Sequence, residues 1–137
     1  MRSHHGNYQY LNVGQNVTTG STSVEVPNNQ IPTLQLQIAD QTWLILGKPD
    51  QQKLTNTTLP RAQVLLWSGE TLEPDLVKKV QPKVAIGTSY RIDRDTMSSL
   101  RQAKTRVFIT GRDGAVQWTP DGFETTLETL EEKASAL

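Results

Sequence analysis

Short runs of apolar residues, separated by polar turns, predict two kinds of β-strand in this chain. In residues 34–38, leucine and isoleucine alternate with glutamine, which predicts a strand with one buried face. The runs 43–46, 63–67, 83–88 and 106–110 are largely apolar without alternation, as is typical of strands covered on both faces. A polar turn over residues 39–41 separates the first two runs, so we predict that they form a hairpin.

Helical patterns fill the intervals between the last three apolar runs. Proline and acidic residues favour the first turn of a helix, and Glu73-Pro74-Asp75 predicts a helix start that is followed by an apolar face. Asp93 is expected to cap a second helix from about Arg94 to Lys104. The apolar residues at helical spacing in these two helices are Leu76, Val77, Val80, Met97, Leu100 and Ala103.

Strands that alternate with helices predict a parallel βαβαβ core with right-handed crossovers. Gly111–Gly114 is interpreted as a tight turn that returns strand 106–110 into an antiparallel partner at 115–119, and residues 120–128 could add a last short strand. Short edge strands are expected at 8–13 and 22–26, and a short helix from Pro49 to Leu54 is left open. The fold class expected is α/β, a mixed sheet with a βαβαβ core flanked by antiparallel hairpins.

The 137 residues are enough for one domain, which we place at residues 8–128. Residues 1–7 are interpreted as a leader or a fragment boundary, and residues 129–137 as an acidic tail. The longest apolar run, Trp43–Gly47, is too short to span a bilayer, and we identify no secretory signal.

Charge is balanced over the whole chain but not along it. Lys+Arg and Asp+Glu both number 14, and there is no cysteine, which excludes disulfides and thiolate chemistry. The segment from Lys78 to Arg112 contains nine basic and two acidic residues, whereas the segment from Asp113 to the C-terminus contains six acidic residues and one basic residue. This pattern indicates either attraction of an anionic partner or neutralisation of the two segments by each other.

Candidates for catalysis are few. His4 and His5 are the only histidines and lie at a chain end, so we assign them to the leader. Ser68 follows a strand, but it has no histidine base nearby in the sequence, and Lys48 would serve only if the fold buried it beside the serine.

Three carboxylates follow strands that end at one edge of the predicted sheet: Asp50, Glu70 and Asp93. Together they could bind Mg²⁺ or Ca²⁺. The alternative is that they cap helices and lie in solvated loops, which we favour.

Nucleic-acid binding has a broader set of candidates. Binders of single strands combine a cationic surface with exposed aromatic rings. Phe108 lies within a strand and is assigned to the core, whereas a loop position favours Tyr90 as a stacking platform. The candidate residues are Lys78, Lys79, Lys83, Tyr90, Arg91 and Arg94. The alternative is that this basic surface is merely solvated.

The order of segments from about residue 8 to 128 resembles the C-terminal half of the metallo-β-lactamase-like domain of ComEC-type DNA-uptake (competence) proteins. The segments that carry the resemblance are "YLNVGQNVTTGSTSVEVP", "NNQIPTLQLQIADQTWLILGKPD", "RAQVLLWSGE", "VQPKVAIGTS" and "RVFITGRDGAVQW". The resemblance implies a metallo-β-lactamase-like half domain.

The metal-ligand motifs of that family are replaced in this chain. Gly47-Lys48 stands where Gly-Asp is usual, Trp67-Ser68-Gly69-Glu70 replaces a His-His-Gly-Ser loop, and Tyr90-Arg91-Ile92-Asp93 replaces a loop with His-Pro. The resemblance therefore implies loops of a degenerate site, made by Lys48, Asp50, Ser68, Gly69, Glu70 and Asp93. It implies no metal, no cofactor and no enzymatic activity.

The resemblance further implies a non-catalytic, extracytoplasmic domain of a membrane channel protein that acts as a structural part or guides single-stranded DNA. The implied partners are single-stranded DNA and the remainder of the channel protein. A half domain would expose one apolar sheet face, so we expect a monomer covered by its own termini, with a dimer as the second outcome. Two alternatives stay open: a divalent-metal-dependent hydrolase or nuclease with a carboxylate site, and a protein-interaction module.

Overall fold

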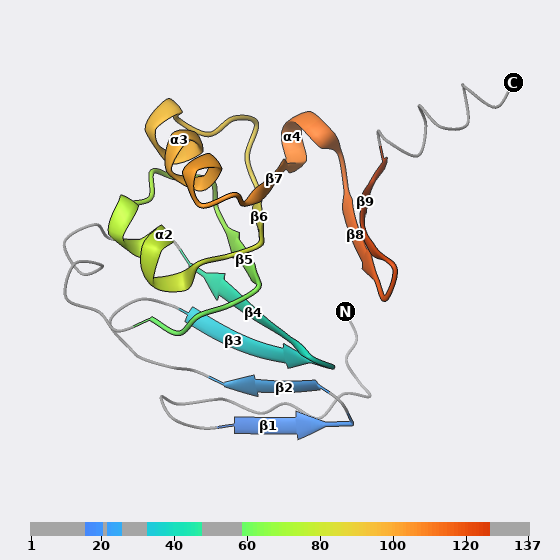
Figure 1. Cartoon of the computed structure of the whole chain (residues 1–137). Coiled ribbons are helices and arrows are strands. Elements are labelled where there is room, and N and C mark those ends of the chain that lie inside the picture. Colours follow the sequence, from blue (N-terminus) through green and yellow to red (C-terminus); the bar gives the residue numbers. More distant parts are fainter. Residues whose placement is uncertain (1–15, 21, 26–32, 48–58, 127–137) are drawn as a thin grey trace, which may run out of the picture.

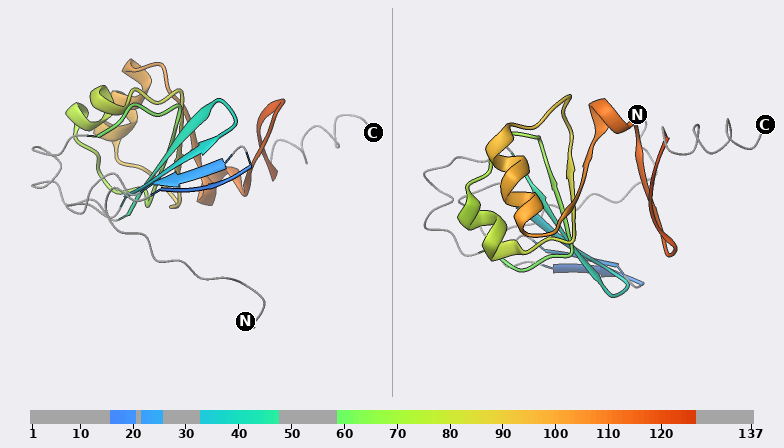
Figure 2. Two further views of the ribbon diagram at one scale, coloured as in Figure 1. Left: turned by 90° about the horizontal axis from the view of Figure 1, so that it is seen from below. Right: turned by 45° about the horizontal axis from the view of Figure 1, so that its top comes forward.

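A mixed sheet with helices on one face and a separate hairpin on the other forms the body of the protein (Figures 1 and 2). The computed structural model describes residues 16–20, 22–25, 33–47 and 59–126. Within these residues one sheet has seven strands in the order β1-β2-β3-β4-β5-β6-β7, and a second has the two strands β8 and β9. The α/β class with a mixed sheet is therefore confirmed.

The first four strands of the large sheet are antiparallel. They are β1 (Asn16–Thr19), β2 (Thr22–Glu25), β3 (Thr33–Ile38) and β4 (Gln41–Leu46). The predicted hairpin of β3 and β4 is confirmed, with Ala39 and Asp40 at its turn and the alternating residues of β3 paired to β4.

The remaining three strands of the sheet extend it in parallel from β4. They are β5 (Val64–Trp67), β6 (Val84–Gly87) and β7 (Arg106–Ile109). Helix α2 (Pro74–Val80) connects β5 to β6, and helix α3 (Arg94–Gln102) connects β6 to β7. The predicted parallel βαβαβ core is confirmed.

The two helices cover one face of the parallel strands and form the main core. Leu44, Leu65, Trp67 and Ala85 from the sheet pack with apolar residues of both helices. The helix residues in this cluster are Leu76, Val77, Val80 and Leu100. The buried face of α3 differs from the expected one of Met97, Leu100 and Ala103. Thr96 and Leu100 are buried, whereas Met97 is half-buried and Ala103 is exposed. The reason is that α3 ends at Gln102, which places Ala103 beyond the last turn.

The opposite face of the sheet is covered by a hairpin whose position the sequence did not predict. Strands β8 (Val116–Thr119) and β9 (Gly122–Thr125) pair with each other, so the expected pairing of β8 with β7 is wrong. Phe123 and Trp118 lie against Trp43, with ring centroids 5.7 Å and 6.1 Å apart, and Phe123 also contacts Phe108 at 6.1 Å. The hairpin thereby covers part of the second apolar face.

The expected turn at Gly111–Gly114 is also wrong, because Thr110–Asp113 forms the short helix α4. The carboxylate of Asp113 accepts a hydrogen bond from the backbone amide of Ile109, at 2.8 Å. The outer edge of β7 is thus occupied by this side chain, and the chain leaves β7 for the other face of the sheet. The expectations for residues 1–15, for the helix after Pro49 and for the tail lie outside the described residues.

Candidate functional site

The carboxyl ends of β5, β6 and β7 lie at one edge of the sheet, where α/β proteins commonly place functional loops. The loop after β5 is held by its own tryptophan, since Trp67 Nε1 donates to the carbonyl of Glu70 at 2.9 Å. The loop after β6 is joined to β5, because Thr88 N donates to the carbonyl of Trp67 at 2.9 Å. Both loops are therefore tied to Trp67 at the end of β5.

These loops lie against one another without room for side chains between them. Gly69 has φ +90°, and a Cβ at this position would overlap the side chain of Ser89. Gly111 N donates to the carbonyl of Ser89 at 2.8 Å, and a Cβ on Gly111 would lie 2.5 Å from the Cα of Tyr90. Gly69 and Gly111 therefore allow the loops to pack directly against one another.

The carboxylate of Asp93 has a structural role at this edge, as the cap of α3. Its carboxylate accepts hydrogen bonds from Thr96 N at 3.0 Å and from Thr96 Oγ1 at 2.7 Å, which confirms the predicted helix cap. Burial raises the pKa of Asp93, but the hydrogen bonds from Thr96 and Thr71 outweigh it and hold the pKa below its usual value. Thr96 Oγ1 also accepts from Leu72 N at 3.0 Å, so the cap connects α3 to the loop after β5.

The structure gives no support to a carboxylate metal site in the part of the chain that it describes. Asp93 is engaged with its helix, and Lys48 and Asp50 lie outside the described residues. No group of three metal-ligating side chains occurs within residues 16–20, 22–25, 33–47 and 59–126. The hydrolase alternative therefore has no assembled site among these residues.

Ser68 is held at the strand end with a buried hydroxyl. Its Oγ has no hydrogen-bond partner among the described residues, which include no histidine. A serine nucleophile needs a base that accepts its proton. The described structure around Ser68 offers no such base.

The basic candidates are divided between opposite edges of the sheet. Lys78 and Lys79 lie in the last turn of α2, and Lys83 leads into β6, so all three lie at the amino edge of the parallel strands. Tyr90, Arg91 and Arg94 follow β6 and lie at the carboxyl edge. Tyr90 is 87% exposed, the largest exposure among the described large apolar and aromatic residues.

The amino edge carries further cations that sequence reasoning missed. Each parallel segment brings basic residues to this edge just before its strand or at the end of its helix: Arg61, Lys78, Lys79, Lys83, Arg101, Lys104 and Arg106. We call this set the amino-edge cations, and all seven are exposed. Asp40, on the turn before β4, is the acidic residue that the described sheet contributes to this edge. The signal in the sequence was a basic residue shortly before each of the strands β5, β6 and β7.

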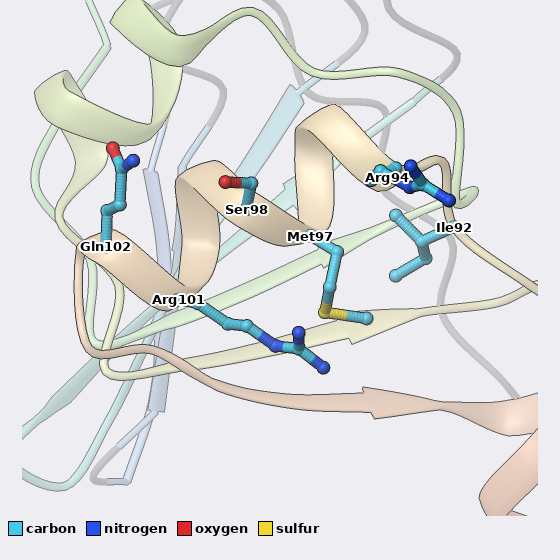
Figure 3. A pocket seen from close by; sticks show the side chains of 6 residues that line it. All are labelled: Ile92, Arg94, Met97, Ser98, Arg101 and Gln102. Carbon is cyan, nitrogen blue, oxygen red and sulfur yellow. The ribbon is translucent and has the colours of Figure 1, made fainter.

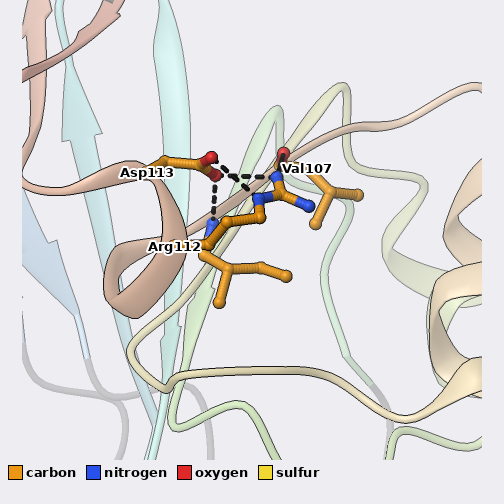
Figure 4. Close-up of polar contacts among 4 residues, drawn as sticks. Val107, Arg112 and Asp113 are labelled. Carbon is orange, nitrogen blue, oxygen red and sulfur yellow. Dashed lines mark hydrogen bonds and ion pairs between the residues drawn. The ribbon is translucent and has the colours of Figure 1, made fainter. Parts of the chain in front are cut away.

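Arg112 and Asp113 protect the open edge of β7 (Figure 4). The backbone amide of Arg106 points toward β6, where it donates to Lys83 O. Because successive residues of a strand direct their backbone groups to opposite sides, those of Val107 and Ile109 point away from β6, toward the open edge. Asp113 accepts from Ile109 N, and Arg112 donates to Val107 O at 3.4 Å and to Asp113 at 2.7 Å. This pair takes the place of a neighbouring strand.

A groove of about 580 Å³ runs along the exposed side of α3 (Figure 3). Its lining residues are Ile92, Arg94, Met97, Ser98, Arg101 and Gln102. The groove connects the carboxyl edge, where Arg94 lies, to the amino-edge cation Arg101.

Comparisons of this chain with protein-family models, with curated proteins and with solved structures find no match. The resemblance to ComEC-type proteins accordingly stays a prediction. Among the described residues no helix has the length and apolar character needed to cross a membrane.

Proposed function

We propose that this chain is a non-catalytic domain that binds single-stranded nucleic acid through its amino edge. The single observation that carries the proposal is the gathering of seven exposed cations at that edge, to which the described sheet adds one acidic residue. Phosphate contacts from lysine and arginine supply most of the affinity of such binders. In the setting that the resemblance implies, the domain would guide DNA in an uptake channel.

Helix dipoles explain only part of this charge. Cations in the last turn of a helix are favoured by its negative end, and this accounts for Lys78, Lys79 and Arg101. Arg61 and Lys83 lie outside helices, in segments that lead into strands, where no helix end requires them. Their collection at one edge supports an anionic partner.

The carboxyl edge has the opposite balance and is the weaker candidate for a polyanion. Its acidic residues at helix starts and loops outnumber its cations: Glu70, Glu73, Asp75, Asp93, Asp95 and Asp113 stand against Arg91, Arg94 and Arg112. Arg112 is also paired with Asp113. A long anion is therefore attracted more strongly to the amino edge than to the carboxyl edge.

Fluorescence anisotropy with a labelled thymidine 12-mer tests the proposal at several salt concentrations. Each phosphate contact contributes about −0.7 to the slope of log K against log salt for a single strand. The triple variant R61Q/K83Q/K104Q should bind at least tenfold more weakly and with a slope smaller by about 2. R91Q, which removes one charge at the carboxyl edge, is a control for position and should change affinity less than twofold.

A wild-type protein that binds no oligonucleotide at 50 mM salt would overturn the proposal. Equal losses in the triple variant and in R91Q would show that the amino edge is not the binding surface. Incubation of the oligonucleotide with Mg²⁺ or Mn²⁺ should leave it intact, and metal-dependent cleavage would instead establish the hydrolase alternative.

A further inference from the structure

The groove along α3 combines cations at its two ends with apolar side chains between them. Arg94 and Arg101 are seven residues apart, so they lie on the same side of the helix, about 10 Å apart along its axis. Met97 projects between them, and Ile92 lies at the Arg94 end (Figure 3).

The cations of the groove are available to a ligand. Arg94 and Arg101 are both exposed, and neither forms an ion pair within the described part of the chain. Met97 and Ile92 are half-buried, and Ile92 packs against the main core, so the apolar floor is anchored. The groove thus presents two positive charges around a fixed, partly apolar surface.

We propose that this groove holds the bases of a single-stranded nucleic acid, with phosphates at Arg94 and Arg101. The proposal rests on the function proposed above and names where the bases lie. The distance between the arginines corresponds to roughly three stacked nucleotides at about 3.4 Å each. A thioether contacts aromatic rings favourably, so Met97 suits the bases, and guanidinium groups pair well with phosphates, so Arg94 and Arg101 suit the backbone.

Continuity with the amino edge distinguishes a nucleic acid from other amphipathic anions. Arg101 belongs both to the groove and to the amino-edge cations, and Lys104 follows it beyond the end of α3. A strand that follows the amino-edge cations reaches the groove at Arg101 and extends along it to Arg94.

The test compares two labelled 12-mers, one of thymidines and one of abasic sugar-phosphate units, which share their phosphates. Wild-type protein should bind the thymidine strand about fivefold more tightly, which is the lower end of the range for a base stacked on an aromatic ring. Met97→Gln should abolish this preference while keeping the affinity for the abasic strand. The amino-edge variant R61Q/K83Q/K104Q should lose affinity for both strands equally and keep the preference.

A second measurement uses the unaltered chain, in case Met97→Gln disturbs folding. A 12-mer that contains 4-thiothymidine is irradiated with the protein, and the crosslinked peptides are identified by mass spectrometry. Crosslinks within residues 92–102 are expected. Binding of both strands with equal affinity, or crosslinks confined to other segments, would overturn the proposal that the groove holds the bases, while leaving the proposed function intact.

An acidic peptide with spaced leucines is the competing occupant. If such a peptide binds with an affinity that Met97→Gln reduces, and the thymidine strand does not displace it, the groove is a protein-docking site and the proposal is wrong. If the wild-type chain binds neither strand, the proposed function and this inference fail together.

Discussion

Replacing Asp113 by alanine should destabilise the protein because this side chain substitutes for a missing strand beside β7. The carboxylate accepts the outward amide of Ile109 at 2.8 Å and pairs with Arg112 at 2.7 Å. Alanine removes both interactions and leaves the outward amide of Ile109 without its acceptor. The side chain of Asp113 is only 19% exposed, so water replaces the carboxylate incompletely.

The size of the effect follows from these two contacts. A partly buried hydrogen bond to a charged acceptor contributes about 1.5–3 kcal/mol. The Arg112 side chain is 52% exposed, so its ion pair adds less than about 1 kcal/mol. We expect a loss of about 2–3 kcal/mol for Asp113→Ala. Asp113→Asn keeps an acceptor for the amide but loses the charge, and should cost about 1 kcal/mol.

Urea unfolding followed by tryptophan fluorescence measures these changes, with Asp121→Ala as a matched control at an exposed turn. The hydrogen bond from Arg112 lowers the pKa of Asp113 against the opposing effect of burial, and the Ile109 amide lowers it further. A lowered folded-state pKa means that the carboxylate stabilises the fold above about pH 4 and that this contribution is lost as pH falls through the folded pKa. Asp113→Asn should lack that part of the acid dependence.

A cost below about 0.5 kcal/mol for Asp113→Ala, equal to that of Asp121→Ala, would refute this account of the β7 edge. So would an acid dependence in Asp113→Asn identical to that of the wild-type protein. Size-exclusion chromatography adds an independent readout, because an unprotected edge favours pairing between copies.

Three further substitutions test the packing around the loops and the hairpin. Thr96→Val should cost about 2 kcal/mol in urea unfolding, because the amide of Leu72 loses its acceptor, and Thr96→Ser should retain most of the stability. Gly69→Ala should cost about 2 kcal/mol or more from positive φ and overlap with Ser89, and adding Ser89→Gly should recover only the overlap. Phe123→Ala should cost about 2 kcal/mol and shift tryptophan emission to the red, whereas loss of stability without such a shift would contradict the placement of the hairpin on the sheet.

The parallel core could be predicted because its signals are local. Each buried strand is a continuous apolar run, and each helix begins with a proline or a capping aspartate that excludes other assignments. The cap at Asp93 forms as expected since its partner, Thr96, lies three residues away. No long-range information was needed for these elements.

The hairpin at the end of the described chain was misplaced because two glycine-containing segments compete as turns. Gly111–Gly114 resembles a hairpin turn, but Asp113 bonds back to β7, and the chain turns away. Pro120-Asp121, between the paired residues Thr119 and Gly122, is the turn that forms, and proline at the first central position of a turn with glycine just after it favours a turn here. Packing of Phe123 on the far face of the sheet then fixes the hairpin, which is a tertiary effect.

The distribution of the basic residues could not be read from their order alone. Parallel strands joined by helices separate neighbours in the sequence and gather residues about 20 positions apart, as with Lys83 and Lys104 at one edge. Tyr90 and Arg91, close to Lys83 in the sequence, lie at the other edge. The degenerate-site loops were predicted as a group, but their closure depends on Gly69 and Gly111, whose contacts are between separate loops.

The opposite charges of the two sheet edges give the protein an electric dipole along its parallel strands. A polyanion at a distance would experience attraction at one end and repulsion at the other, so the molecule would rotate before contact is made. Association in dilute salt should then be fast. Its rate should fall steeply as added ions screen the field, whose range is about 10 Å at 0.1 M salt. Encounters would begin with the amino edge foremost, and the strand would reach Arg94, at the far end of the α3 groove, last.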